Sequence, residues 1–251
     1  MEALKDRVAI VTGAGQGVGR GVAMALAAEG AKVAVTGRTV SKCETVVAEI
    51  EERGGQAIAI RCDVESRADV DDTVAATVEE WGQLDILVNN AQTLVYKTVR
   101  NFEEADLESM WQSGPVATLR FQQAAFPHLR QTKGVIVNMG SGSSIMPHPL
   151  MSGYAMAKEA IRVLSRVTAL EWAKFGIRVN SICPLAETPG WDLFTGSAPG
   201  AEEQVLSTIP LGRMGHPEND IGRAVVYLCG NDGSYITGTT LMLDGGFNYL
   251  R

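Results

Sequence analysis

A tyrosine and a lysine four residues apart are the side chains whose chemistry is easiest to recognise in this sequence. Tyr154 and Lys158 lie in a stretch, 153–175, where we expect a helix, and residues i and i+4 share one face of a helix. A free tyrosine has a pKa of about 10, too high for efficient proton transfer near neutrality. A neighbouring ammonium lowers that pKa, so the pair predicts an acid/base group.

A serine ahead of that helix strengthens the interpretation. Ser141 directly follows an apolar run, 134–140, that we expect to be a strand. Ligands of open parallel sheets bind at the carboxyl ends of the strands. Ser141, Tyr154 and Lys158 are therefore the candidate catalytic residues.

The elements that would position these residues alternate along the chain. Short apolar runs, nearly continuous in apolar residues, are typical of strands buried on both faces. Their alternation with helices predicts a parallel sheet covered on both sides. We expect one α/β domain over residues 1–251, a doubly wound Rossmann fold of about seven strands. The expected strands are 8–12, 32–37, 57–62, 84–90, 134–140, 176–183 and 239–246, and the expected helices are 18–30, 41–53, 66–81, part of 103–129, and 153–175.

The turn between the first expected strand and the first expected helix is rich in glycine (TGAGQGVG, 12–19). Glycines there let the backbone approach a pyrophosphate, which the N–H groups and dipole of the following helix then bind. The spacing differs from G-x-G-x-x-G, but the position between strand and helix predicts dinucleotide binding, with a purely structural turn as the alternative. The expected cofactor contacts of this turn are Gly13, Gln16, Gly17, Val18 and Gly19.

The end of the second expected strand bears on the choice of cofactor. An acidic residue there would bind the 2′-hydroxyl of the adenosine ribose. In this chain Gly37 is followed by Arg38, and a guanidinium binds a 2′-phosphate through charge-assisted hydrogen bonds. We therefore expect NADP(H) to be preferred, with NAD(H) as the second cofactor. An ordinary surface arginine is the alternative.

Several short motifs, in order and on suitable elements, resemble those of the short-chain dehydrogenase/reductase superfamily. The resemblance covers nearly the whole chain and is to the single-domain type, in particular 3-oxoacyl-ACP reductase-like members. It implies an NAD(P)-dependent oxidoreductase acting on a carbonyl or a secondary alcohol. The motifs are TGAGQGVG (12–19), Asp63-Val64, NNA (89–91), Ser141, YAMAK (154–158), RVNSICP (178–184) and ITG…LDGG (236–246).

The same resemblance implies roles for individual residues. Ser141 would hydrogen-bond the substrate oxygen, and Tyr154 would exchange a proton with it. Lys158 would hold the nicotinamide ribose and tune Tyr154. The further implied cofactor residues are Asp63 and Val64 at the adenine, Asn90 and Ala91 in the groove, and Pro184 and Thr188 towards the nicotinamide.

The chain departs from the family pattern in the helix after the fourth strand. Relatives usually have an Asn there that helps a water chain relay protons to the lysine, whereas this chain has Gly114, followed by Pro115. Proline cannot donate the i→i−4 hydrogen bond, so we expect a kink or a helix restart. The freed carbonyls, assisted by Ser113, could hold a water instead.

Two further departures follow the fourth and sixth strands. Gln92 replaces a glycine after NNA, and it either points towards the nicotinamide or substrate or is a tolerated loop residue. Leu185 replaces the glycine of the usual Pro-Gly pair, and the stretch from there to Thr188 is one residue short, which leaves those contacts open.

Composition limits the partners. Lys and Arg number 22 against 29 Asp and Glu, a net charge of −7 without a basic run, which disfavours nucleic acid and anionic membranes. The four cysteines form no Cys-x-x-Cys pair, which argues against structural zinc and a disulfide framework and predicts buried thiols. The N-terminal sequence lacks signal-peptide architecture and no apolar run reaches ~20 residues, so we expect a cytoplasmic enzyme without a metal.

An insertion at about 185–215, rich in Gly, Pro and Thr, is expected to be a substrate lid. Trp191 and Phe194 give it apolar character, either to line a small-molecule pocket or to pack on the core or a neighbouring subunit. The resemblance implies a homo-oligomer, a tetramer or a dimer, in which helices 103–129 and 153–175 pair across an interface.

Two other functions compete with an NADP(H)-dependent ketone/alcohol oxidoreductase. Gly114 and Leu185 favour a catalytically weak NADP(H)-binding regulator or scaffold, but retention of Ser141, Tyr154 and Lys158 opposes it. A nicotinamide-using lyase or epimerase is the third reading, because a fold alone does not fix the reaction.

Overall fold

The centre of the computed structural model, which describes residues 3–189, 191 and 201–249, is a seven-stranded sheet in the order β3-β2-β1-β4-β5-β6-β7. Every neighbouring pair of strands is parallel, which confirms the predicted doubly wound α/β fold. The strands are β1 (Val8–Thr12), β2 (Lys32–Gly37), β3 (Gln56–Arg61), β4 (Ile86–Asn89), β5 (Val135–Met139), β6 (Arg178–Pro184) and β7 (Thr240–Leu243).

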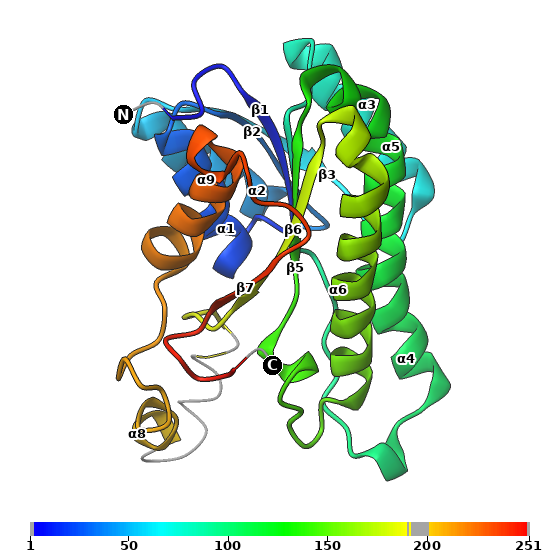
Figure 1. Cartoon of the computed structure of the whole chain (residues 1–251), viewed down its shortest axis with the longest axis vertical. Coiled ribbons are helices and arrows are strands. Elements are labelled where there is room, and N and C mark those ends of the chain that lie inside the picture. The colour runs from blue at the N-terminus through cyan, green and yellow to red at the C-terminus, as the bar shows by residue number, and fades with distance from the viewer. Residues whose placement is uncertain (1–2, 190, 192–200, 250–251) are drawn as a thin grey trace.

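Helices cover both faces of the sheet (Figure 1). One face carries α1 (Gly17–Ala28), α2 (Val40–Glu52) and α9 (Arg223–Cys229), the last preceded by a π-helical turn, Pro217–Gly222. The other face carries α3 (Arg67–Trp81), α4 (Glu104–Trp111), α5 (Ala117–Thr132) and α6 (Ser152–Trp172). The short helix α8 (Ala201–Leu206) lies in the predicted lid.

The first strand shows why the sheet is buried on both sides. Successive side chains of a strand point to opposite faces, and all five residues of β1 are buried. Ala9 and Val11 pack into the cluster of α1, α2 and α9, whereas Val8 and Ile10 pack into that of α3, α5 and α6. The nearly continuous apolar run of this strand was therefore a correct indicator of a central parallel strand.

The order of the strands reverses at β1. The chain runs from β1 outward to β2 and β3, then returns to add β4 on the other side of β1. A crevice forms at the carboxyl ends of strands where the order reverses. The glycine-rich turn after β1 and the NNA motif at the end of β4 meet at this point.

The helix expected within 103–129 is interrupted where proline predicted a break. A π-helical turn, Gln112–Val116, separates α4 from α5 and contains Pro115. The Ser113 hydroxyl donates to the Ser109 carbonyl oxygen at 2.7 Å and accepts from the Thr93 N–H at 3.0 Å. The turn is thereby tied to the loop that follows β4.

The remaining sequence predictions concern cysteines, membranes and the lid. All four cysteines are free and buried, which confirms the prediction of buried thiols. Within the described ranges, no helix has the length and apolar character needed to cross a membrane. Part of the predicted lid, including Phe194, lies outside the described residues.

Candidate active site

A groove of about 580 Å³ runs along the carboxyl edge of the sheet, over the point where the strand order reverses. It brings together most of the predicted cofactor residues. Three other residues predicted to contact the cofactor, Tyr154, Lys158 and Pro184, are not among its lining residues; Pro184 ends β6 and pairs with Leu243 of β7. The predicted residues that line the groove are Gly13, Gln16, Gly17, Val18, Gly19, Arg38, Asp63, Val64, Asn90, Ala91 and Thr188.

The glycine-rich turn has the geometry of an anion-binding turn. Gly13 has a φ of +63°, which glycine adopts without strain. A Cβ on Gly19 would lie 2.5 Å from both the Gly13 carbonyl oxygen and the Asn90 side-chain nitrogen. Gln16, the N-cap of α1, makes no side-chain capping bond, so the N–H groups of the first turn stay available to a phosphate.

Asn90 fastens the end of β4 to this turn. Its Nδ2 donates to the Thr12 and Gly13 carbonyl oxygens at 2.8 and 3.1 Å. The backbone N–H groups of Asn90 and Ala91 donate to the Thr12 hydroxyl at 2.9 and 3.0 Å. Asn90 therefore holds the glycine-rich turn and the end of β4 together, and both line the groove.

The adenosine end of the groove is lined by two cationic side chains, Arg38 and Lys42. Arg38 is exposed at the end of β2, and no ion pair to it occurs in the part of the chain that the structure describes. Lys42 Nζ donates to Gln16 Oε1 at 2.6 Å. A guanidinium and an ammonium at this place suit a 2′-phosphate, whereas a carboxylate would suit a free 2′-hydroxyl.

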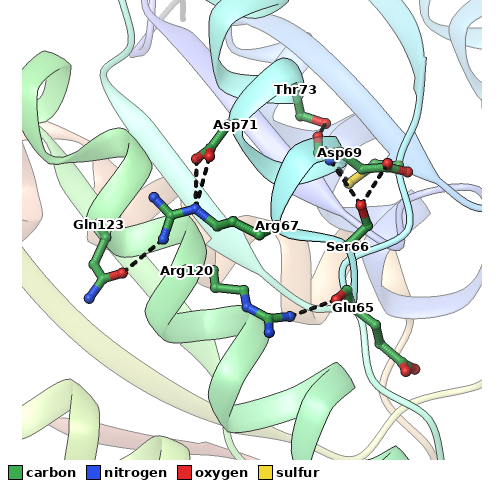
Figure 2. A network of polar contacts seen from close by, with 9 residues as sticks. Glu65, Ser66, Arg67, Asp69, Asp71, Thr73, Arg120 and Gln123 are labelled. Atoms are coloured by element: carbon green, nitrogen blue, oxygen red, sulfur yellow. Dashed lines mark hydrogen bonds and ion pairs between the residues drawn. The ribbon is translucent and has the colours of Figure 1, made fainter.

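The loop that contains Asp63 and Val64 continues into Glu65 and Ser66, which contact α5 and the start of α3 (Figure 2). The Asp63 N–H and the Ser66 hydroxyl each donate to Asp69, both at 2.9 Å, and these two bonds, in that order, lower the pKa of the Asp69 carboxyl. Arg120 reaches across from α5 and donates to the Glu65 carbonyl oxygen at 2.7 Å. The predicted adenine-binding loop is thus fixed from two helices.

The three predicted catalytic residues meet at the end of β5. Tyr154 and Lys158 lie on the first turns of α6, and Ser141 follows β5 after one residue. Lys158 is buried; its Nζ donates to the Met139 carbonyl oxygen at 2.7 Å and lies 5.4 Å from the Tyr154 ring centroid. The structure therefore brings the trio together as the sequence predicted.

Burial acts on both titrating members of this trio. It raises the pKa of Tyr154 to about 12, while a hydrogen bond with Ser141 opposes the rise and the nearby Tyr96 and Cys183 add to it. Burial also lowers the pKa of Lys158 to about 7. A bound group that favours the Lys158 ammonium would restore a positive charge beside the phenol and lower the pKa of Tyr154.

Ser141 is oriented by the short 3₁₀ turn that follows it, Gly142–Ser144. Its Oγ lies 2.8 Å from Ser143 Oγ and accepts from the Ser143 N–H at 3.2 Å. A Cβ on Gly142 would lie 2.2 Å from Asn248 Nδ2, which donates to Asp244 at 3.0 Å. Sequence reasoning missed Asn248; its position a few residues after the LDGG motif was the available signal.

Gln92 lines the groove beside Ser113, and its side chain lies against Gly114. The polar atoms of the Gln92 amide are buried against Gly114. Leu185 extends the β6–β7 pairing, since its N–H donates to the Leu243 carbonyl oxygen at 2.9 Å. Thr188 lies near Gly17 at the glycine-rich turn, and its hydroxyl accepts from the Trp191 N–H at 3.2 Å.

The chain is similar to known proteins over nearly its whole length. Residues 13–248 match the family model described as enoyl-(acyl carrier protein) reductase. A 12α-hydroxysteroid dehydrogenase of a Clostridium species is 39% identical over 248 residues, which cover 96% of each chain. A 2,5-dichloro-2,5-cyclohexadiene-1,4-diol dehydrogenase of Sphingobium indicum is 34% identical, covering 98% of this chain and 97% of the other.

A solved structure adds a bound cofactor to the comparison. The 7α-hydroxysteroid dehydrogenase complexed with NADH and 7-oxo-glycochenodeoxycholic acid superimposes with a TM-score of 0.92, at 32% identity, over 97% of this chain and 94% of that one. The chain belongs to the short-chain dehydrogenase/reductase family, and it is an NAD(P)-dependent oxidoreductase acting on CH–OH groups. The open α1 N-terminus and the glycine cradle of the groove fit such a dinucleotide.

Proposed function

We propose that this protein interconverts a ketone and a secondary alcohol with NADP(H), using Tyr154 as the acid/base. The observation that carries the proposal is the convergence of Ser141, Tyr154 and Lys158 at the carboxyl end of β5, beside a groove lined by a glycine-rich turn. A scaffold that only bound nucleotide would not need a buried lysine beside a tyrosine.

The bound cofactor supplies or accepts the hydride at the substrate carbon. In the direction of reduction, the Tyr154 hydroxyl donates its proton to the substrate oxygen, and the Ser141 hydroxyl donates a hydrogen bond to the same oxygen. In the direction of oxidation, the Tyr154 phenolate removes the alcohol proton. Ser141 lies close enough to Tyr154 to oppose the rise in the pKa of the phenol.

Lys158 has two functions in this proposal. Its ammonium holds the hydroxyls of the nicotinamide ribose, and its charge lowers the pKa of Tyr154. Because burial lowers the pKa of Lys158 itself to about 7, the ammonium depends on the ligands around it. An anionic cofactor in the groove favours the charged form, so cofactor binding would activate Tyr154.

The preference for NADP(H) rests on Arg38 and Lys42 at the adenosine end of the groove. Arg38 is well placed to bind a 2′-phosphate through charge-assisted hydrogen bonds. Asp63 and Val64 would flank the adenine, Asn90 and Ala91 the central groove, and Pro184 and Thr188 the region leading to the nicotinamide.

The substrate we propose is a secondary alcohol or ketone on a ring. The relatives named above are hydroxysteroid and cyclic diol dehydrogenases. Met146 and Leu150, on the loop before Tyr154, are exposed and would give the pocket an apolar wall. The 185–215 segment would close over such a substrate as a lid.

We further propose a cytoplasmic homo-oligomer, a tetramer or a dimer. Exposed apolar side chains gather on the outer helices of one face, α5 and α6, and would be buried against another subunit. They are Leu119, Met156, Val163, Val167 and Leu170.

A spectrophotometric panel tests the proposed reaction. The purified protein is mixed with NADPH or NADH and with cyclic ketones, including oxo-steroids and diketones, and the loss of reduced-cofactor absorbance is followed. Turnover of at least one ketone, with the higher kcat/KM for NADPH, is the expected result. Tight NADPH binding without turnover of any ketone or of the matching alcohols would favour the scaffold alternative.

A further inference from the structure

A second pocket, of about 600 Å³, lies at the amino ends of the strands. Its walls come from the segments that lead into β1, β5, β6 and β7. In Figure 1 these segments lie at the end of the sheet opposite to α8. The length of the sheet therefore separates this pocket from Tyr154 and from the glycine-rich turn.

Three cationic side chains line the pocket, and they belong to Arg7, Lys133 and Arg178. No carboxylate lines it within the part of the chain that the structure describes, although the whole chain carries a net charge of −7. None of the three cations is in an ion pair with a described residue. Three unneutralised positive charges in one pocket of an acidic protein indicate a ligand of negative charge.

Arg178, the first residue of β6, is partly buried and is held in place by backbone carbonyl groups. Its Nη1 donates to the Leu228 carbonyl oxygen at 2.7 Å and to the Ile236 carbonyl oxygen at 3.3 Å. Its Nε and Nη2 groups donate to none of the described residues, so these N–H groups remain available to a ligand. Arg178 is therefore positioned by α9 and by the segment before β7, with donors to spare.

Arg7 lies close enough to Arg178 for the two positive charges to interact. Burial lowers the pKa of Arg178, and the charge of Arg7 lowers it further. Burial also raises the pKa of the Cys229 thiol to about 12, and the charges of Arg178 and Arg7 both oppose that rise. Because like charges repel, this pair destabilises the fold unless an anion lies between them.

Lys133 adds the third charge from the turn between α5 and β5. It has a φ of +53°, in the left-handed region that a lysine seldom adopts. Its side chain packs on the turn before β6, where a Cβ on Gly176 would lie 3.0 Å from Lys133 Cγ. The stem of Lys133 thus lies on the segment that leads to Arg178.

We propose that this pocket binds a phosphate dianion, either free or as the phosphate group of a small molecule. The two guanidinium groups suit the paired oxygens of a phosphate, and the ammonium adds a third positive charge. The pocket is about as large as the cofactor groove, so it has room for an organic phosphate as well as for the free ion. Side chains with uncharged hydrogen-bond donors also line it, namely Asn231, Ser234 and Thr237. This site is additional to the proposed oxidoreductase function and does not depend on it.

Calorimetric titration at constant ionic strength, with inorganic phosphate, pyrophosphate and glycerol 3-phosphate, tests the site. We expect saturable binding that Arg7→Gln and Lys133→Gln each weaken roughly tenfold or more, the scale of one hydrogen bond between charged groups. Arg38→Ala, in the cofactor groove, and the exposed Arg100→Gln should keep this binding. A proteins' panel in which none of the three anions binds, or in which only Arg38→Ala weakens binding, overturns the proposal.

The three anions also distinguish the two sources of the phosphate group. Tighter binding of glycerol 3-phosphate than of inorganic phosphate assigns the pocket to an organic phosphate. Equal or tighter binding of inorganic phosphate assigns it to the free ion. Both results support a phosphate site, provided that Arg7→Gln weakens the binding.

The melting temperature of Arg7→Gln separates ligand binding from a structural role. In chloride without phosphate, the variant should melt at or above the temperature of the parent, because its repulsion with Arg178 is removed. Saturating pyrophosphate should raise the melting temperature of the parent by more than that of the variant. A variant that melts well below the parent in chloride would show that Arg7 stabilises the fold itself, which contradicts the proposed site.

A crystal structure of the protein grown with pyrophosphate locates the bound anion. The expected result is an anion within hydrogen-bond distance of both Arg7 and Arg178. An anion bound only at the glycine-rich turn would contradict the assignment. None of these measurements uses turnover, so a failure of the ketone panel would refute the proposed reaction and leave this site unaffected.

Discussion

Lys158 Nζ donates to the Met139 carbonyl oxygen at 2.7 Å and lies 5.4 Å from the centroid of the Tyr154 ring. The end of β5 therefore positions the Lys158 side chain. The protonation state of Lys158 then determines whether a positive charge lies beside Tyr154. Because burial raises the pKa of Tyr154 and lowers the pKa of Lys158, the pKa of Tyr154 depends strongly on whether Lys158 is charged.

Replacing Lys158 tests that relationship. Lys158→Met should lower kcat/KM for ketone reduction by at least about 100-fold, the usual scale of acid/base assistance, and should weaken NADPH binding as well. The exposed Lys174→Met, on the turn after α6, should stay within about twofold of the parent in the same assay. Parent-like rates in Lys158→Met would show that the lysine neither tunes Tyr154 nor holds the cofactor.

The lowered pKa of Lys158 also predicts how stability depends on pH. Its pKa falls from 10.5 to about 7 on folding, so between pH 7 and 10 the unfolded chain binds a proton that the unliganded folded chain does not. The contribution of Lys158 to the free energy of unfolding therefore rises with pH across this window. The urea midpoint of the parent, relative to that of Lys158→Met, should therefore increase from pH 7 to pH 10. A difference between the two midpoints that stays constant with pH would show that the lysine is not desolvated.

Arg38 decides the predicted preference for NADPH. Arg38→Ala should raise the KM for NADPH by roughly 10- to 100-fold, because a hydrogen bond to a charged group contributes ~1.5–3 kcal/mol. The KM for NADH should change by less than about threefold, since NADH lacks the 2′-phosphate. The exposed Arg100→Ala is the control. An equal rise in the KM for NADPH and for NADH would mean that Arg38 does not bind the 2′-phosphate.

Replacing Asn90 tests whether its side chain stabilises the glycine-rich turn. Asn90→Ala removes the two side-chain bonds to Thr12 and Gly13, and it should lower the free energy of unfolding by ~1–3 kcal/mol and weaken cofactor binding. Chemical denaturation and fluorescence titration with NADPH measure both effects. Asn101→Ala, at an exposed asparagine, should change neither. Unchanged binding in Asn90→Ala would show that the turn holds its shape without this amide.

Much of this fold followed from local patterns. The run Val8–Thr12 and the stretch Arg67–Trp81 were predicted nearly to the residue, because a short apolar run indicates a buried strand and a longer stretch between two such runs indicates a helix. Pro115 likewise indicated the interruption between α4 and α5. Proline lacks a backbone N–H wherever it occurs, so its effect on a helix can be predicted from the sequence alone. Ser141, Tyr154 and Lys158 were predicted from spacing and from their place at the strand ends.

Contacts between distant segments were not predictable in this way. Tertiary packing places Gln92 against Gly114 and Asn248 against Gly142. The spacing of residues along the sequence does not predict such contacts. The lowered pKa of Lys158 is also a product of burial, and a sequence that places a lysine near a tyrosine does not say how deeply it lies.

The activity of Tyr154→Phe tests the central claim most directly. With NADPH and the best ketone of the panel, the variant should lose at least about 100-fold in kcat while NADPH binding, measured by fluorescence titration, stays within about threefold of the parent. Tyr235→Phe, at a fully exposed tyrosine, should keep the parent's rate and affinity. A Tyr154→Phe protein that reduces the ketone at the parent's rate would contradict the assignment of Tyr154 as the acid/base.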